Sequence, residues 1–367
     1  MVKKVKIYLF IFFYWVLIVD LLAYFGLSSM KGFVEVAQID VESLNSPLIA
    51  FWISPFQLYE STLFGVFFGL LFIAVNEVSD RLEVEKLSFG RIIIIRSFMY
   101  LFGFAVIFSL VYTIMSQFEI FPKEELKELK GEKTVYVLLV MAMLFIGFQI
   151  MLINFMLQTM KKFGTNNLFN ILRGTYRSPK VENRIFLFID LKSSTRYAES
   201  LGNIKYSNMI KDCIDEINMV VDEYDAEIYQ YVGDEVVLTW KTDKVTNVPL
   251  YLDIFFAIEE RILKRKEYYS KRYSMLPEFK GGIQGGNVTV TEIGNIKRDI
   301  AYHGDVLNTA SRLQSICNDY NQKLLISKAL YTTAKADDKY ETVSLGEIQL
   351  KGKLQTVEVL SVKRKVD

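Results

Sequence analysis

The sequence predicts an α-helical membrane domain with four transmembrane helices, followed by an α+β domain of the soluble type. Three observations predict it. The apolar residues gather before about residue 160, in four stretches long enough to cross a bilayer, which takes about 20 residues. From about residue 180 onward, short apolar runs alternate with amphipathic segments at helical spacing. The whole chain has only six prolines, which argues against long disordered linkers.

The composition excludes several classes of protein. The 43 basic and 42 acidic residues nearly cancel, so the chain has no basic field for nucleic acid. Cys213 and Cys317 lie far apart without metal-ligand spacing, which excludes a disulfide scaffold and a zinc finger. His303 is the only histidine, so a mechanism with several imidazoles is excluded. Carboxylates must therefore carry any chemistry.

The four predicted spans cover residues 7–27, 58–76, 92–115 and 135–156. Residues 46–56 are apolar but contain two prolines, and we interpret them as an interfacial or re-entrant segment. Ionisable residues in membrane spans are functional by default, although those near the ends can snorkel to the interface, as we suggest for Glu77 and Arg96. The ionisable residues in or near the spans are Asp20, Glu60, Glu77 and Arg96.

The distribution of lysines and arginines predicts the orientation. Basic residues precede the first span and follow the fourth, which favours the cytoplasmic side of the cell (inner) membrane for both. Four lysines in the loop of residues 116–134 weaken this argument. The basic N-terminus could open a signal peptide, but no small-residue cleavage site follows, so we expect no cleavage. We expect a multi-pass membrane protein whose second half is cytoplasmic.

The second half predicts the order strand, helix, strand, strand, helix, strand, which is the ferredoxin-like split pattern. The strands are expected at residues 184–189, 227–232, 235–240 and 279–289, and the helices at about 193–224 and 248–273. A short strand near Ile300, a helix at 306–319, a strand at 324–327 and a hairpin within 341–362 should follow.

Two aspartates occupy distinctive positions in this pattern. Asp190 ends a buried strand just before a predicted helix N-cap, and Asp234 lies in the tight turn of the next hairpin. A βαββ unit brings these points together at one edge of the sheet. Two carboxylates near a helix N-terminus would bind Mg²⁺ together with nucleotide phosphates. The alternative is that each aspartate is ordinary cap or turn chemistry.

Asn308 and Arg312 form a third element, because residues four apart share one face of a helix. An amide and a guanidinium placed in this way could hold a ribose and a charged phosphoryl group. The alternative is a surface amide and an exposed arginine.

Five motifs in order, FLFIDLKSST, YQYVGDEVVLTW, GGIQGGNV, HGDVLNTASRLQ and LKGKLQTVEV, carry a resemblance. Residues of about 180–365 resemble the catalytic domain of class III adenylate/guanylate cyclases. The predicted fold is thus a four-helix membrane domain followed by an α+β, ferredoxin-like cyclase catalytic domain. Multi-span membrane regions also precede this domain in bacterial members of the family.

The resemblance implies roles for single residues. Asp190 and Asp234 look like the paired metal-binding aspartates, with a backbone carbonyl from Leu191, for two Mg²⁺ or Mn²⁺ ions per site. Asn308 looks like the ribose-orienting asparagine and Arg312 like the transition-state arginine. In this family the two groups come from different chains, which implies a homodimer with two equivalent sites.

Further residues are implied to bind the substrate. Lys353, with Lys351 as substitute, resembles the lysine that holds the triphosphate, and Lys280 replaces a phosphate-facing arginine. A lysine keeps the charge but loses the bidentate fork. The helix start at Ser193, Ser194 and Thr195 is the remaining candidate for the phosphates.

The purine-reading positions depart from the family pattern. Adenylate cyclases usually carry lysine at the position of Gln230 and aspartate or threonine at that of Ala301, whereas guanylate cyclases favour glutamate and a small polar residue. Gln230 could hydrogen-bond with either purine. We expect ATP as substrate because adenylate cyclases are common in the family, and conversion to 3′,5′-cyclic AMP as the reaction. We interpret His303 as structural.

Other interpretations stay open. The first is a guanylate cyclase or another nucleotide cyclase. A diguanylate cyclase also has a Gly-Asp-Glu turn, but Val232 and Val236 do not fit its signature. A membrane receptor with an inactive nucleotide-binding domain is the non-enzyme alternative, yet no implied aspartate or arginine is missing. A transporter has little support, because the spans show no obvious repeat.

The expected boundaries are 1–158 for the transmembrane domain, 159–182 for a helical connector and 183–367 for the catalytic domain. The connector is too apolar for a flexible tether, with Leu168, Phe169, Ile171 and Leu172 in a short helical pattern. We expect paired connectors to set the relative position of two catalytic domains.

Overall fold

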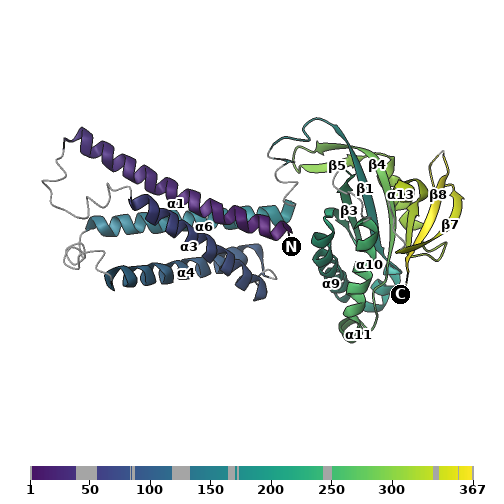
Figure 1. Cartoon of the computed structure of the whole chain (residues 1–367). Coiled ribbons are helices and arrows are strands. Elements are labelled where there is room, and N and C mark those ends of the chain that lie inside the picture. Colours follow the sequence, from purple (N-terminus) through teal and green to yellow (C-terminus); the bar gives the residue numbers. More distant parts are fainter. Residues whose placement is uncertain are drawn as a thin grey trace. The chain divides into compact units, whose positions relative to one another are not determined.

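The computed structural model describes residues 2–38, 56–82, 84, 87–117, 133–163, 170–171, 173–242, 250–333, 339–353 and 355–365 (Figure 1). The chain divides into two compact units, Met1–Lys162 and Phe163–Asp367. Each unit is described by itself below.

The first unit contains long apolar helices: α1 (Val2–Val36), α3 (Phe56–Arg81), α4 (Phe89–Gln117) and α6 (Lys133–Phe163). Four helices among the described residues are long and apolar enough to cross a membrane. Large apolar side chains point outward from them, including Phe13, Leu17 and Phe98. Such a surface suits lipid rather than water. The predicted four apolar helices are confirmed, while the segment at 46–56 lies outside the described residues except for Phe56.

Glycines allow α3 to pack tightly against α1. A Cβ atom on Gly65 would lie 2.6 Å from the Cα atom of Val16, and one on Gly69 would lie 2.8 Å from the ring of Phe12. Small residues four apart let helix backbones approach closely, which favours the association of apolar helices. The Gly-x-x-x-Gly spacing on α3 is therefore used within the chain.

Asp20 and Arg96 bond to side chains of a neighbouring helix. The Asp20 carboxylate of α1 accepts hydrogen bonds from Ser61 (2.6 Å) and Thr62 (2.9 Å) of α3. Arg96 of α4 is 1% exposed, and its guanidinium lies 2.8 Å from the Ser79 hydroxyl and 3.3 Å from the Asp80 carboxylate. Snorkelling does not describe Arg96, because it is buried between helices.

Glu77 also has a partner inside the unit. Its carboxylate accepts a hydrogen bond of 2.7 Å from the hydroxyl of Tyr8 on α1. The contact joins α3 to α1 at the end of the unit where α1 begins, so Glu77 contributes to helix packing.

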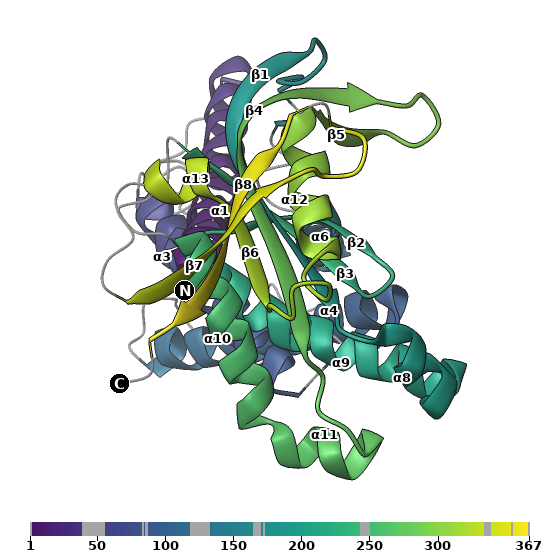
Figure 2. The same cartoon turned by 90° about the vertical axis from the view of Figure 1, so that its right-hand side faces the viewer.

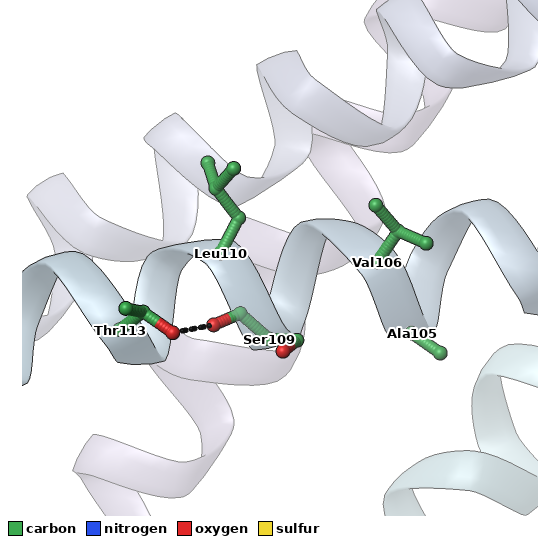
Figure 3. A pocket seen from close by; sticks show the side chains of 5 residues that line it. All are labelled: Ala105, Val106, Ser109, Leu110 and Thr113. Atoms are coloured by element: carbon green, nitrogen blue, oxygen red, sulfur yellow. Dashed lines mark hydrogen bonds between the residues drawn. The ribbon is translucent and has the colours of Figure 1, made fainter.

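A surface hollow of about 560 Å³ lies along α4 (Figure 3). The described residues around it are Ala105, Val106, Ser109, Leu110 and Thr113, and the hydroxyl of Thr113 donates to the backbone carbonyl of Ser109 (2.8 Å). None of the predicted site residues lines this hollow.

The second unit is built on one mixed sheet with the strand order β2-β3-β1-β4-β6-β8-β7, and β5 pairs with β4 beside this path. The strands are β1 (Lys180–Leu191), β2 (Glu227–Val232), β3 (Glu235–Lys241), β4 (Phe279–Ile293), β5 (Asp299–His303), β6 (Leu324–Ser327), β7 (Tyr340–Ile348) and β8 (Val357–Arg364). The helices are α8 (Ser194–Leu201), α9 (Asn203–Val221), α10 (Leu250–Lys264), α11 (Lys266–Tyr273), α12 (Asp305–Ser315) and α13 (Lys328–Thr333).

The order β2-β3-β1-β4, with antiparallel neighbours, confirms the ferredoxin-like pattern. The two long helices predicted at about 193–224 and 248–273 are each divided into two helices, so their predicted continuity is wrong. Gly202, with a φ of 72°, separates α8 from α9, and Arg265 separates α10 from α11. Strand β4 is longer than predicted and forms a hairpin with β5.

Alternation along β1 distributes its side chains between two cores. Leu187 and Ile189 pack with residues of α9, α10 and α11, whereas Phe186 and Phe188 pack on the other face with Val306 and Ala310 of α12. Successive side chains of a strand point to opposite faces, so residue 190 lies on the same side as 186 and 188. The alternation therefore puts Asp190 on the face against which α12 packs. Figure 2 shows α12 lying along the sheet.

A buried charge network stands at the start of β1. The guanidinium of Arg184 is 1% exposed and pairs with Glu182 (2.7 Å) and Glu227 (2.9 Å), and it lies over the ring of Tyr302 (4.8 Å). Burial would raise the pKa of Glu182, but hydrogen bonds from Lys241, Arg184 and Tyr176 outweigh it and lower that pKa. The network joins β1, β2 and β5.

Replacing Arg184 by methionine should lower the free energy of unfolding by about 3 kcal/mol, because the partly buried carboxylates of Glu182 and Glu227 would each lose one charged partner. For a unit of this size the melting temperature should fall by about 6–12 °C. Thermal unfolding of the full-length protein in detergent measures it, with exposed Arg364→Met as control. A melting temperature equal to that of the wild type would show that the network adds nothing to stability.

Candidate active site

Asp190 lies next to Lys280 at the end of two paired strands. The register of β1 and β4 places the two residues opposite each other, and the Lys280 ammonium lies 3.3 Å from Oδ2 of Asp190. Direct cross-strand neighbours of opposite charge attract each other. Lys280 therefore lies beside this aspartate, a contact that the sequence analysis did not predict.

The hairpin of β2 and β3 brings Asp234 to the same place. The pairing of Ile189 with Val236 puts the turn at residues 233–234 next to Asp190. Gly233 has a φ of 64°, a left-handed conformation that suits the first position of such a tight turn. The predicted convergence of Asp190 and Asp234 at one edge of the sheet is thus present.

The two carboxylates create a local excess of negative charge. Burial and the neighbouring Asp234 raise the pKa of Asp190, while Lys280 opposes this effect. Burial, followed by the charges of Asp190 and Asp234, raises the pKa of Glu235 to about 7. One ammonium group does not balance three carboxylates, so the site favours further positive charge.

The donor set suits a hard divalent cation. Oδ2 of Asp234 is buried and has no hydrogen-bond partner among the described residues, although such atoms are normally paired. Carboxylate and carbonyl oxygens are the ligands that Mg²⁺ prefers. No group of three or more His, Cys, Asp or Glu residues with metal-site geometry occurs in the described part of the chain. The candidate metal ligands are the carboxylates of Asp190 and Asp234, next to the backbone of Leu191.

The predicted phosphate-binding residues lie at the start of α8, directly after this strand end. The helix begins at Ser194, and Ser193 precedes it with a φ of 60° and no side-chain cap hydrogen bond. Ser193 and Thr195 are exposed, whereas Ser194 is half-buried. The helix starts where the sequence predicted. The prediction that a side chain caps this helix start is wrong, because no such hydrogen bond is present at Ser193.

Helix α12 carries Asn308 and Arg312 one turn apart. Asn308 is exposed and Arg312 is half-buried. Gly352, with a φ of 72°, lies close to this arginine, because a Cβ atom there would be 3.3 Å from its Nη2 atom. The turn before β8 thus approaches the face of α12 that carries Arg312.

Lys353 belongs to the same face. Its side chain is 14% exposed, and its ammonium lies 2.6 Å from Oδ2 of Asp305 and 2.8 Å from the hydroxyl of Thr309. Lys351 is exposed at the preceding turn. Of the two candidate lysines, Lys353 is the one that the structure brings to α12.

One helix links the two groups of residues but points them in different directions. The side-chain amide of Gln314 on α12 donates to Oδ2 of Asp190 (2.8 Å). At about 100° per residue, Gln314 is turned about 240° from Asn308 and about 200° from Arg312 around the helix axis. Asn308 and Arg312 therefore project away from the aspartate pair of their own chain.

The two purine-reading candidates lie on strands that are brought together. Gln230 is exposed on β2, whereas Ala301 is buried on β5, opposite Thr291 of β4. The rings of their neighbours Tyr229 and Tyr302 meet at 4.8 Å. His303 is exposed at the end of β5.

Sequence reasoning missed five residues near these groups: Tyr206, Glu235, Asp305, Thr309 and Gln314. Tyr206 interacts with Ser194 and lies near both aspartates. Asp305, Thr309 and Gln314 are all on α12, inside or beside the motif that already contained Asn308 and Arg312. Polar side chains on an amphipathic helix could have been a signal for these three residues. Their partners lie far away in sequence, so the contacts could not be predicted.

Comparisons with known proteins agree with this geometry. Residues 177–362 match the family described as the adenylate and guanylate cyclase catalytic domain. Adenylate cyclase 2 of Rhizobium meliloti (strain 1021) is 33% identical over 208 residues, which cover 57% of this chain and 57% of that protein. Adenylate cyclase 1 of the same organism is 29% identical over 189 residues, which cover 49% of this chain and 28% of that protein.

The alignments thus span little more than half of the first relative and about a quarter of the second. Among solved structures, a bacterial light-regulated adenylyl cyclase is similar with a TM-score of 0.51 at 16% identity, over 65% of this chain and 68% of that one. The similarity to this solved structure concerns the fold alone, because the sequence identity is low. The motifs, the converging aspartates and the family match lead to one conclusion: the chain belongs to the class III adenylate/guanylate cyclase family.

Proposed function

We propose that the protein is a membrane-bound nucleotidyl cyclase that converts ATP to 3′,5′-cyclic AMP and pyrophosphate for intracellular signalling. The observation that carries the proposal is the pair Asp190 and Asp234, brought together beside Lys280 with one buried, unpartnered carboxylate oxygen. The family match and the relatives named adenylate cyclase support it.

The chain's own residues bind and orient the nucleotide. Asn308 holds the ribose so that its 3′-hydroxyl faces the α-phosphorus, and Arg312 stabilises negative charge on the phosphoryl oxygens. The 3′ oxygen forms a bond to the α-phosphorus and gives up its proton to water. The bond between that phosphorus and the bridging oxygen breaks, and pyrophosphate leaves. Lys353, Lys280 and the start of α8 hold the phosphates.

Two Mg²⁺ or Mn²⁺ ions would be held by Asp190, Asp234 and the carbonyl of Leu191. When bound, they would lower the pKa of the 3′-hydroxyl and offset charge on the α-phosphate and the departing pyrophosphate. The closeness of Asp190 to Asp234 supports this assignment, because a cation would relieve the repulsion between the two carboxylates.

A homodimer completes the proposed site. Asn308 and Arg312 project away from the aspartates of their own chain, so they would serve the site of a second copy. Exposed apolar residues at the tips of the two hairpins support such an association: Tyr231, Val232, Ile293 and Ile296.

The membrane helices would place the catalytic unit in the cytoplasm, where ATP is available. We propose residues 159–182 as the connector between a transmembrane domain of 1–158 and a catalytic domain of 183–367. Tyr176, near the end of the proposed connector, is buried, and its backbone carbonyl accepts a hydrogen bond from the backbone nitrogen of Glu292 on β4 (2.8 Å). These contacts support a firm attachment of the connector to the sheet.

Incubation of the full-length protein with each nucleoside triphosphate and Mg²⁺ or Mn²⁺ tests the proposal. ATP should give a 3′,5′-cyclic product and pyrophosphate in equal amounts, with a larger kcat/KM than GTP. A higher kcat/KM for GTP would make the enzyme a guanylate cyclase, in which Gln230 reads guanine. Linear products, or none from a dimeric protein, would contradict the cyclase assignment.

A further inference from the structure

Gln314 is a buried polar residue for which the proposed reaction has no role so far. Its side chain is 5% exposed, and its Nε2 atom lies 2.8 Å from Oδ2 of Asp190. A buried amide without a partner is unfavourable, so this hydrogen bond constrains both side chains.

The position of Gln314 is fixed by the packing of α12 on β4. A Cβ atom on Gly282 would lie 2.3 Å from the backbone nitrogen of Gln314 and 2.3 Å from the carbonyl oxygen of Ala310. Gly282 is two residues from Lys280 on the strand that pairs with β1. Backbone meets backbone here, so the helix cannot turn or slide without opening the core.

The contacts of Asp190 are unequal. Both Gln314 and Lys280 approach Oδ2, at 2.8 Å and 3.3 Å. Two donors on one oxygen fix the rotation of the carboxylate, and they leave Oδ1 as the oxygen without a donor from either residue. Groups that hydrogen-bond to metal-binding carboxylates typically change metal affinity by about 10–100-fold.

We propose that Gln314 is a positioning residue that orients Asp190 for metal binding and joins the metal site to the helix that carries Asn308 and Arg312. The inference rests on the proposed function. In the homodimer each α12 would then belong to both sites. It would touch the metal aspartate of one site through Gln314 and present its arginine to the other.

Binding of Mn²⁺ to the full-length protein tests the orientation directly, without turnover. The electron paramagnetic resonance signal of free Mn²⁺ is measured while Mn²⁺ is added to each protein. The proteins are the wild type and the variants Gln314→Met, Gln314→Asn and Asp190→Ala. Methionine keeps the size but not the donor, and asparagine keeps the amide but not the reach. Both should weaken binding by about 10-fold, toward the level of Asp190→Ala.

Gln322→Met is the matched control, because Gln322 lies beyond the end of α12. The Gln322→Met protein should bind Mn²⁺ with wild-type affinity. If both Gln314 variants keep wild-type affinity, the inference is wrong while the proposed function stands. If the wild type binds Mn²⁺ no better than Asp190→Ala, the metal site and the proposed function fail together with it.

Mixed dimers distinguish two roles of Gln314, the orientation of Asp190 and the general stabilisation of α12. A chain with Arg312→Ala supplies Asp190, a chain with Asp190→Ala supplies Arg312, and together they form one complete site. Gln314→Met in the first chain should raise the Mn²⁺ concentration for half-maximal activity by about 10-fold. In the second chain it should change nothing, because its partner is already absent. Equal effects in both chains would show that Gln314 only supports the helix.

Discussion

Asp190→Ala should lower the rate of cyclic nucleotide formation by about 1000-fold or more, and Arg312→Ala by about 100- to 1000-fold. The first change removes a carboxylate from the proposed metal site, beside Lys280 and Asp234. The second removes a group that stabilises charge mainly in the transition state, so kcat should fall more than the affinity for ATP.

Two exposed residues provide matched controls for these changes. Asp319→Ala and Arg364→Ala remove the same functional groups from the surface and should keep wild-type rates. Initial rates of product formation by purified full-length protein measure all four variants. An Asp190→Ala enzyme with more than about a tenth of wild-type activity would exclude this carboxylate from the chemistry.

Inserting five Gly/Ser residues after Gly174 should lower the activity of the full-length protein by about 100-fold. The hydrogen bond from the Thr175 nitrogen to the carbonyl of Asn170 (2.9 Å) spans this point, and Tyr176 just beyond it is buried against the sheet. The insertion would add a flexible segment within the proposed connector of residues 159–182. A misplacement of about 1 Å in a shared site can cost about 100-fold in rate.

The dimer content of the variant must be measured together with its activity, by crosslinking in detergent. A five-residue replacement of an exposed surface segment by Gly/Ser, without a change of length, serves as control. Unchanged activity with unchanged dimerisation would show that the membrane half is only an anchor and that the connector transmits nothing.

Much of this fold could be predicted because it depends on local patterns. The apolar run ending at Ile189 predicted the central strand, and the Gly233-Asp234 pair predicted the turn opposite its end. Once both were placed in a split βαββ unit, topology alone brought Asp190 and Asp234 together. This part of the site follows from the order of the elements.

Helix ends were harder to predict. The amphipathic pattern continues across Gly202, so its spacing did not reveal that α8 and α9 are separate helices. Glycine costs only about 1 kcal/mol within a helix, which makes it a weak signal for a break. Arg265, between α10 and α11, has no such signal at all.

The contacts of α12 could not be predicted, because they depend on how far the helix is rotated on the sheet. Gln314 and Asp190 are 124 residues apart, and Lys353 and Asp305 are 48 residues apart. Neither pair follows from local periodicity. They depend on the close approach of α12 to Gly282 and on the turn at Gly352, which only the folded chain reveals.

The most direct test of a site shared by two copies is the activity of mixed variants. Asp190→Ala and Arg312→Ala proteins, each nearly inactive alone, are combined in equal amounts under conditions in which subunit exchange is demonstrated. Half of the dimers should then be mixed, and each mixed dimer has one intact site of two, so activity should return to about a quarter of wild type. No recovery despite exchange would show that each site is built within one chain, which contradicts the account.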